Sequence, residues 1–231
     1  MKKTGIIFDM DGTLWDSAAS VAASWTEILQ TWPKDPGRRA ISKEEISSVM
    51  GQTMTAISAK MFPSLDDKGQ QELGDACMKY ENEYLRKHGG TLYPRLRETL
   101  ELLSRDYPLY IVSNCQQGYI EAFLEYYKLG NLFVDHLCWG DTGLEKDGTM
   151  TKMVDRHHLD QWYYVGDIEA DYRSTQKAGG IFIHAGYGFG EVPEAEHRIC
   201  SLTDLPDLMK KLNCSDATAA PGFPLSTTGI P

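Results

Sequence analysis

Short apolar runs alternate with amphipathic segments through the second half of the chain. Four of these runs have the length of buried strands, at residues 109–112, 133–138, 162–165 and 181–183. Apolar residues recur at helical spacing around and between them, at about residues 96–103, 120–127, 153–157 and 170–178. Strands that alternate with helices predict a parallel sheet with right-handed crossovers. We therefore expect an α/β fold of the Rossmann-like kind, with 181–183 as its last strand.

The first half of the chain has a different pattern. An apolar run at residues 5–8 predicts the opening strand, but from residue 17 to about residue 88 the spacing is helical without an obvious strand. Asp16 or Ser17 can cap the first of four expected helices, and Ser42 begins a capping box for the second. This change predicts a helical module inserted into the α/β core. We expect the core at 1–15 and 91–214, the module at 16–90, and a loose tail at 215–231.

Polar residues follow directly after several of the expected strands. The carboxyl ends of parallel strands meet at one edge of a sheet, where ligands bind. We place one lysine, Lys146, in the connection after the run 133–138. The residues expected to line a single crevice are Asp9, Asp11, Ser113, Asn114, Lys146, Asp167 and Asp171.

Asp9 and Asp11 are the most informative of these residues. Side chains two positions apart in an extended segment point to the same side. Two carboxylates held that close cannot easily both stay ionised without a cation or a shared proton, and Gly12 allows the chain to turn away at once. The pair predicts a metal site or acid–base chemistry. On its own it fits equally well an Asx-type turn that closes a strand.

Composition limits the possible functions. The chain has 231 residues, 42% of them hydrophobic and 24% charged, with a formal net charge of -10. Such a composition is typical of a globular protein. The acidic balance argues against a nucleic-acid partner, since phosphate contacts need clustered Lys and Arg. An anionic small substrate stays possible, because one lysine and a metal ion can reverse the local charge in a cleft.

The N-terminus and the cysteines give information about the cellular location of the protein. The apolar run before Asp9 is too short for a signal peptide or a membrane span. The five cysteines are scattered and include no Cys-x-x-Cys pair, so we expect reduced thiols and no zinc site. These features predict a cytoplasmic protein without a membrane partner. They give no oligomeric state.

Four motifs together resemble those of the haloacid dehalogenase superfamily, in its phosphatase branch. They are Phe-Asp-Met-Asp-Gly-Thr-Leu at 8–14, Ser113-Asn114, the lysine Lys146, and Val-Gly-Asp-Ile-Glu-Ala-Asp at 165–171. The match runs in motif order over about residues 4–212. The inserted helices resemble the α-helical cap of the phosphoglycolate phosphatase and β-phosphoglucomutase type. The resemblance implies that residues 16–90 form such a cap.

The resemblance also implies a role for each matching residue. Asp9 would be the nucleophile and Asp11 the general acid and base. Mg²⁺, a hard cation, would be held by Asp9, Asp167 and the main-chain carbonyl of Asp11, with Asp171 as a further ligand or as an orienter of metal-bound water. For Glu169 two positions stay possible: one close to the metal and one on the protein surface.

Phosphate and substrate contacts follow from the same resemblance. Ser113, Asn114 and Lys146 would contact the phosphate oxygens. Lys146 precedes Asp147 where the family often has proline, and Lys152 is the alternative lysine. In the cap, Gln52 is the candidate contact to the leaving group, and Trp15 is a candidate at the hinge or entrance.

These expectations combine into one function with stated alternatives. We predict a Mg²⁺-dependent phosphatase that hydrolyses a small phosphomonoester metabolite through an aspartyl-phosphate intermediate. The alternatives are a phosphomutase of the β-phosphoglucomutase type, a dehalogenase, and a non-catalytic module that binds a phosphorylated metabolite. The first expected helix contains no histidine of the kind that the mutases carry there. The sequence does not identify the substrate.

Overall fold

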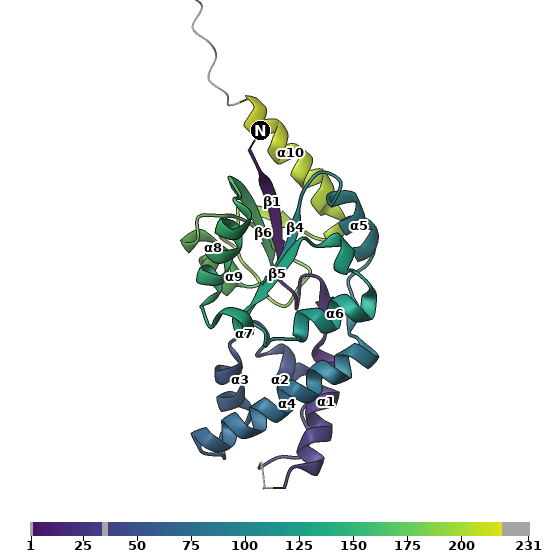
Figure 1. Ribbon diagram of the computed structural model, residues 1–231, viewed down its shortest axis with the longest axis vertical. Helices are drawn as coiled ribbons and strands as arrows, with labels where there is room; N and C mark the ends of the chain where they lie inside the picture. The colour runs from purple at the N-terminus through teal and green to yellow at the C-terminus, as the bar shows by residue number, and fades with distance from the viewer. Residues whose placement is uncertain (1, 34–36, 219–231) are drawn as a thin grey trace, which may run out of the picture.

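A computed structural model describes residues 2–33 and 37–218, and it has an α/β core with helices gathered at one end (Figure 1). The core sheet has six parallel strands in the order β5-β4-β1-β6-β7-β8. Their bounds are Thr4–Phe8 (β1), Leu109–Ser113 (β4), Asp135–Cys138 (β5), Gln161–Gly166 (β6), Ile181–Ala185 (β7) and His197–Ile199 (β8). This confirms the predicted fold class.

The edge strand β8 was not predicted. We expected the sheet to end at 181–183, but His197 to Ile199 pairs in parallel with β7, with Ile183 opposite His197. The segment is three residues long, and only Ile199 in it is buried. A strand this short and polar has no apolar run, so its pairing depends on the neighbouring strand.

Helices cover both faces of the sheet. Helices α8 (Lys146–His157) and α9 (Glu169–Lys177) lie on one side of the sheet in Figure 1, and α5 (Leu96–Leu103) and α10 (Leu205–Thr218) lie on the other. The other helical elements of the core are α6 (Tyr119–Tyr127), α7 (Trp139–Thr142) and the short helices η1 (Gly130–Leu132) and η2 (Leu202–Asp204).

The central strand shows how the two faces are filled. Side chains alternate across a strand, and in β1 the buried Ile6 and Phe8 join one hydrophobic cluster while Ile7 joins the other. The cluster that contains Ile7 includes Met150 and Met153 of α8. The cluster that contains Ile6 continues into the helices beyond the sheet edge. One core therefore joins the sheet to those helices.

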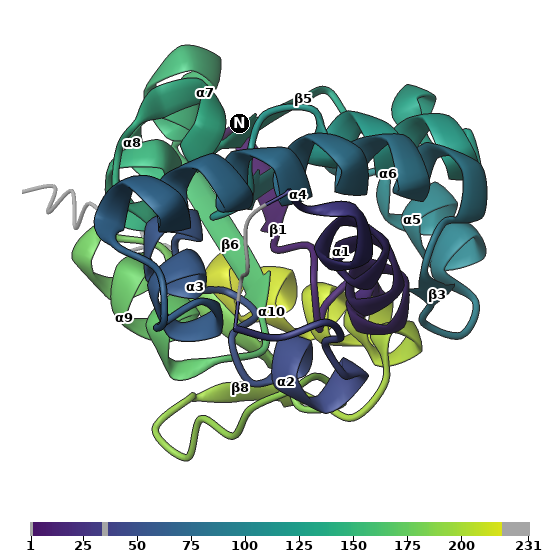
Figure 2. The same cartoon turned by 90° about the horizontal axis from the view of Figure 1, so that it is seen from below.

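Four helices gather beyond the carboxyl ends of the strands, and we call them the four-helix segment (residues 18–88; Figures 1 and 2). They are α1 (Ala18–Thr31), α2 (Lys43–Ser47), α3 (Met54–Met61) and α4 (Asp67–His88). The predicted capping box is present at Ser42, whose hydroxyl accepts from the Glu45 amide. Residues 34–36 of the expected α1–α2 turn lie outside the described residues.

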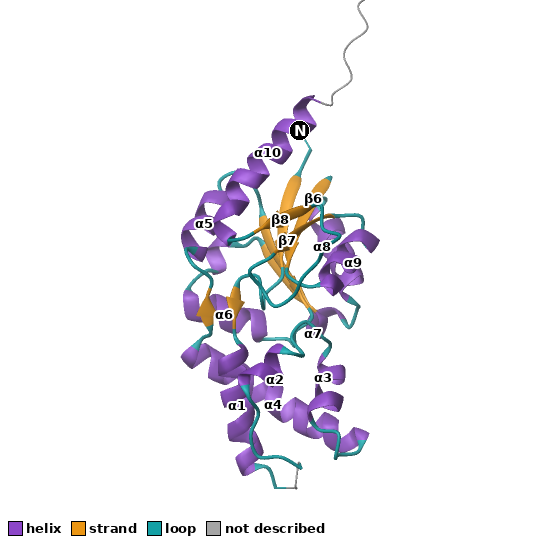
Figure 3. Cartoon of the chain, turned by 180° about the vertical axis from the view of Figure 1, so that it is seen from behind, coloured by secondary structure: helices purple, strands orange, loops and turns teal. Residues whose placement is uncertain are grey.

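A pair of short strands marks the entry to and the exit from the four-helix segment. Strand β2 (Trp15–Asp16) pairs antiparallel with β3 (Thr91–Leu92), as the small orange arrows in Figure 3 show. The sequence pattern did not predict this pair, because two-residue strands are too short for a periodicity. The pair falls at the positions where we placed the boundaries of the inserted module.

The expected loose tail begins within the last helix. Helix α10 extends to Thr218, so residues 215–218 are helical. The remaining tail, 219–231, lies outside the described residues. Among the helices of the described chain, none is both long enough and apolar enough to cross a membrane.

Candidate active site

The chain turns sharply where β1 ends. The Asp9 amide donates to the Val165 carbonyl at 2.9 Å, which continues the sheet by one residue. Gly12 then has φ +83°, and a Cβ atom there would lie 2.0 Å from Oδ2 of Asp167. Both the left-handed backbone and the close approach require glycine. The turn thus places the Asp9 carboxylate beside Asp167.

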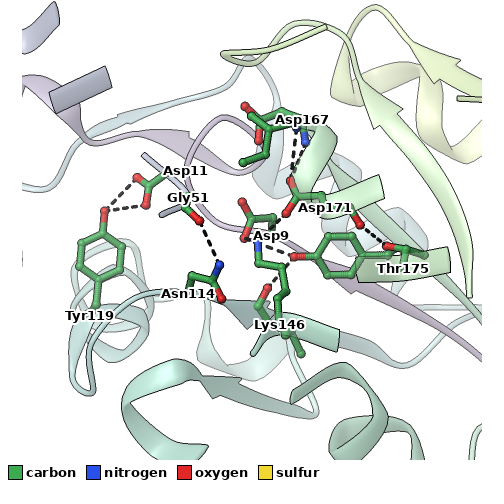
Figure 4. A network of polar contacts seen from close by, with 12 residues as sticks. Asp9, Asp11, Gly51, Asn114, Tyr119, Lys146, Asp167, Asp171 and Thr175 are labelled. Carbon is green, nitrogen blue, oxygen red and sulfur yellow. Dashed lines mark hydrogen bonds and ion pairs between the residues drawn. The ribbon is translucent and has the colours of Figure 1, made fainter. Parts of the chain in front are cut away.

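Three buried carboxylates meet at this edge of the sheet. Asp9, Asp167 and Asp171 each offer one carboxylate oxygen, and these oxygens all lie within 4.8 Å of one another (Figure 4). The exposed fractions of the three residues are 2%, 1% and 0%. Convergent carboxylate oxygens are the ligands that hard divalent cations prefer. These three residues are the group in the described chain that could hold a metal ion.

Backbone amides hold two of the three carboxylates. Oδ2 of Asp167 accepts from the Phe189 amide at 2.7 Å. Oδ2 of Asp171 accepts from the amides of Asp167 at 3.1 Å and Ile168 at 3.3 Å, at the N-terminus of α9. Amides at a helix N-terminus favour a negative charge. Both carboxylates are therefore oriented by the main chain.

Lys146 lies among the carboxylates. Its Nζ donates to Oδ1 of Asp9 at 2.9 Å and to Oδ1 of Asp171 at 2.5 Å, and the residue is 3% exposed. It is the first residue of α8, whereas we had placed it in the connection before a shorter helix. Lys152, the alternative, is an exposed residue of the same helix. The structure thus brings Lys146, and not Lys152, to the site.

Tyr164 is a member of this network that the sequence analysis missed. Its hydroxyl lies 3.3 Å from Oδ1 of Asp9 and donates to the Val112 carbonyl at 2.7 Å. The Lys146 Nζ lies 5.7 Å from the centre of its ring. We had read Tyr164 only as part of an apolar strand. Only the pairing of β6 with β1 in the structure brings its hydroxyl to Asp9, and no pattern in the sequence indicated this.

The charge balance of the network favours a cation. Three carboxylates and one ammonium leave a net charge of -2 when all are ionised. Burial raises the pKa of Asp9 to about 6 and that of Asp167 to about 8. Burial lowers the pKa of Lys146, but the charges of Asp171 and Asp9 outweigh it, so that this pKa lies above its usual value. A bound divalent cation would relieve the repulsion between the acids.

Asp11 lies apart from the three carboxylates (Figure 4). Its carboxylate accepts from the Tyr119 hydroxyl at 2.8 and 2.9 Å and from the Ser17 hydroxyl at 2.6 Å. Burial raises the pKa of Asp11 to about 7, although both hydroxyls lower it. Such a pKa suits a group that gives and takes a proton near neutral pH.

The two hydroxyl partners of Asp11 were not predicted. Ser17 stands at the N-cap of α1 but makes no side-chain cap hydrogen bond, because its hydroxyl serves Asp11. The Asp16 carboxylate instead accepts from the Ala18 amide at 3.0 Å. Tyr119 is the first residue of α6, five positions after Asn114, and only the tertiary structure brings it to Asp11.

A cavity separates the sheet edge from the four-helix segment. Its lining includes Asp11, Ser113, Asn114 and Gln52. Ser113 ends β4, and the Asn114 amide donates to the Gly51 carbonyl at 2.9 Å. This hydrogen bond ties the loop before α3 to the core. Four of the predicted site residues thus line one cavity, next to the carboxylate network.

Trp15 lies in β2, at the hinge where we expected it, but it does not face the entrance to the site. Trp15 is 0% exposed and does not line the cavity. Its ring packs against those of Tyr119, Phe123 and Tyr127, with centroids 5.6, 5.0 and 6.1 Å apart. The pairing of β2 with β3 turns the indole into this aromatic cluster.

Glu169 has the surface position that the sequence left open. Its carboxylate accepts from Nε of Arg173 at 3.0 Å, one turn along α9, and both side chains are more than half exposed. It is not one of the three convergent carboxylates. The paired charge on the outside of α9 explains why this acid does not add to the charge of the site.

Comparison with known proteins assigns the family. A model of the haloacid dehalogenase-like hydrolase family matches residues 6–185. The chain belongs to this family. This confirms the resemblance seen in the sequence, and with it the prediction of a hydrolytic enzyme.

Individual relatives agree with the phosphatase branch. The chain is 29% identical over 203 residues to a phosphoglycolate phosphatase of Aliivibrio fischeri, covering 80% of this chain and 86% of the relative. It is 29% identical over 192 residues to a phosphoglycolate phosphatase of Aquifex aeolicus, covering 80% and 85%. A crystal structure of a predicted phosphoglycolate phosphatase from Haemophilus somnus shares the fold, with a TM-score of 0.77, 21% identity, and coverage of 90% and 99%.

Proposed function

We propose that this haloacid dehalogenase-like hydrolase is a Mg²⁺-dependent phosphatase that acts on a small phosphomonoester through an aspartyl-phosphate intermediate. The observation that carries the proposal is the buried network in which Asp9, Asp167 and Asp171 converge around Lys146, with Asp11 beside it. A nucleophile, a cation site and a proton donor next to one cavity are the parts that phosphoryl transfer needs.

Asp9 would act as the nucleophile. Lys146 and Tyr164 both contact its Oδ1, so we assign the attack on phosphorus to Oδ2. In the first step the bond from Oδ2 to phosphorus forms while the bond from phosphorus to the alcohol oxygen breaks. Asp11 gives its proton to that oxygen as it leaves. A pKa near 7 leaves a substantial fraction of Asp11 protonated for this step.

The second step reverses the proton transfer. Water attacks phosphorus, the bond between phosphorus and Oδ2 of Asp9 breaks, and Asp11 takes a proton from the water. Inorganic phosphate and the free Asp9 carboxylate result. The hydroxyls of Ser17 and Tyr119 hold Asp11 in place through both steps.

Asp9, Asp167 and the main-chain carbonyl of Asp11 would hold Mg²⁺. When bound, this cation neutralises charge on the phosphoryl group during transfer. Both oxygens of Asp171 already accept hydrogen bonds, from Lys146 and from two amides. We therefore favour Asp171 as an orienting residue rather than as a direct ligand.

The remaining predicted residues complete the proposal. Lys146 would contact the phosphate oxygens together with the Ser113 hydroxyl and the Asn114 amide, and Gln52 would contact the leaving group. The four-helix segment would serve as the cap, with β2 and β3 at its hinge. A cytoplasmic location remains a prediction. Helix α1 carries no histidine, so the phosphomutase alternative gains no support.

The test is release of phosphate from p-nitrophenyl phosphate in the presence of Mg²⁺. Removing a nucleophile typically costs several orders of magnitude in rate, so Asp9→Asn should lower kcat at least about a thousandfold. Asp106→Asn makes the same chemical change at an exposed position remote from the site and should leave the rate unchanged. Equal rates for the parent and Asp9→Asn would contradict the proposal.

A further inference from the structure

The cavity beside Asp11 has an apolar wall. On the side of the four-helix segment this wall is built from buried side chains of three helices and their connections, among them Val21, Trp25, Ile46, Val49, Met54 and Ile57. Asp11 and Ser113 line the opposite side. The leaving group of a phosphate ester bound at Asp9 would therefore enter a largely apolar space.

The wall contains no cation. Within the part of the chain that the structure describes, no Lys, Arg or His lines this cavity. The lysines of α2 and α3 have partners elsewhere: Lys43 pairs with Asp16 at 2.7 Å, and Lys60 donates to the Ser48 carbonyl at 3.4 Å. A second negative charge on a substrate would find no counterion on this side of the site.

The wall contains an acid instead. Glu81 of α4 lines the cavity and is 3% exposed. Its Oε1 accepts from the Gln116 amide at 2.9 Å, and its Oε2 accepts from the Trp25 indole. A carboxylate oxygen can accept two hydrogen bonds, so each oxygen keeps one acceptor position. Glu81 can thus receive a hydrogen bond from a donor in the cavity.

A carboxylate on the substrate would be disfavoured here. It would enter an apolar space that holds the acids Glu81 and Asp11 and no positive charge. Burying an ionised group without a partner is costly, and a neighbouring acid adds repulsion whenever that acid is itself ionised. A hydroxyl or an amide N–H would instead find an acceptor on Glu81.

We infer that the substrate is the phosphate ester of an uncharged alcohol with an apolar body, and that Glu81 sets this preference by accepting a hydrogen bond from a donor on the leaving group. The inference rests on the proposed phosphatase function. It separates this chain in substrate class from the relatives named for phosphoglycolate, whose leaving group carries a carboxylate.

The test compares three phosphate esters of similar size and shape. Phosphoglycolate and isobutyl phosphate have the same number of non-hydrogen atoms, and 1,2-propanediol 1-phosphate replaces one methyl group of the latter by a hydroxyl. We expect kcat/KM for isobutyl phosphate to exceed that for phosphoglycolate at least about tenfold. For one enantiomer of the diol ester, kcat/KM should be higher than for either of these two substrates. Glu81→Leu should abolish the advantage of the diol ester over isobutyl phosphate.

A variant that introduces a positive charge provides the second readout. Gln52 is exposed and lines the cavity, so the Gln52→Lys variant should fold and should place an ammonium group at the mouth of the cavity. We expect the ratio of kcat/KM for phosphoglycolate to that for isobutyl phosphate to rise at least about tenfold. Gln71→Lys makes the same charge change on an exposed part of α4 away from this cavity, and should leave the ratio unchanged.

The outcomes separate the inference from the function on which it rests. If the parent prefers phosphoglycolate, or hydrolyses none of the three esters while it hydrolyses p-nitrophenyl phosphate, the inference fails and the phosphatase stands. An unchanged ratio in Gln52→Lys also counts against the inference. Failure of the parent to show any Asp9-dependent release of phosphate overturns the proposed function itself.

Discussion

The carboxylate network and the cavity wall lie on either side of Asp11 and are held in different ways. In the network, backbone amides and one lysine orient Asp167 and Asp171. In the wall, packed apolar side chains surround one acid, Glu81. Groups oriented by the main chain keep their geometry when neighbouring side chains change. The network therefore suits a fixed chemical step, and the wall suits selection of one substrate.

Removal of the metal should have the largest effect and should act on the network alone. We expect EDTA to lower kcat at least about a thousandfold and Mg²⁺ to restore it, because the cation stabilises charge in the transition state. Mg²⁺ should also raise the Tm of the parent, since a ligand that binds only the folded protein stabilises it. Asp167→Asn should lose most of this rise, whereas Asp106→Asn should retain it. An activity that persists in EDTA would contradict the metal site.

The two lysines of α8 test which side chain belongs to the network. Lys146→Ala should lower kcat about a hundredfold to a thousandfold, because it would remove the charged contact that we propose to the transferring group. Lys152→Ala, at an exposed position of the same helix, should match the parent in kcat and KM. Both variants are measured by phosphate release at saturating Mg²⁺. A reversal of these two results would assign the phosphate contact to Lys152.

The buried acid Glu81 allows the cavity wall to be tested through the pH dependence of protein stability. Burial raises the pKa of this acid from 4.5 to about 7. The folded protein thus binds a proton between these pH values that the unfolded chain releases, so the free energy of unfolding falls as pH rises across this range. Relative to Glu81→Gln, the parent should lose up to about 3 kcal/mol between pH 4.5 and 7.5. Urea unfolding at several pH values measures this difference.

The control for this prediction lies on the same helix. Glu83→Gln removes an exposed carboxylate of α4 and should show no such pH dependence relative to the parent. The titratable groups that influence Glu81 or are influenced by it, Asp11, Cys77 and Tyr119, are present in all three proteins. A difference between the parent and Glu81→Gln that stays constant with pH would show that Glu81 is not held as a buried acid.

Substitution of Tyr119 should have the smallest effect on the rate. It tests Asp11, which lies between the carboxylate network and the cavity wall. Tyr119→Phe removes a hydroxyl that positions Asp11 and lowers its pKa. We expect kcat to fall about tenfold and the Asp11 limb of the pH–rate profile to move to higher pH. Tyr126→Phe, at a residue 41% exposed, should change neither quantity. A lower rate with an unmoved pH profile would indicate a structural role only.

Much of the network was predictable because its residues follow strands. Asp9 and Asp167 come directly after apolar runs, and the edge of a parallel sheet gathers strand ends in space. Lys146 was found by motif order, although we misplaced it in a loop. Tyr164 was missed because a tyrosine inside an apolar run looks like core. Its hydroxyl matters only because β6 lies beside β1.

The wall was much less predictable. Gln52 was expected near the substrate and does line the cavity, but Glu81 had no signal as a polar position within a long amphipathic helix. Trp15 was expected at the hinge or entrance; it lies at the hinge, in β2, but is buried in an aromatic cluster and does not line the cavity. The inserted helices contribute side chains to the cavity wall from turns that are far apart in the sequence. Helical periodicity shows which face is apolar but not what that face meets.

By itself, the sequence determined the α/β class, the helical insertion and the carboxylates at the strand ends, because apolar periodicity and strand-end position are local properties of the chain. Only the tertiary structure decided that Lys146 joins Asp9 and Asp171, that Tyr119 and Ser17 hold Asp11, and that Glu81 faces the cavity. Each of these depends on contacts between distant segments. Packing of the four-helix segment against the sheet brings Glu81 to the cavity, and no local pattern records that packing.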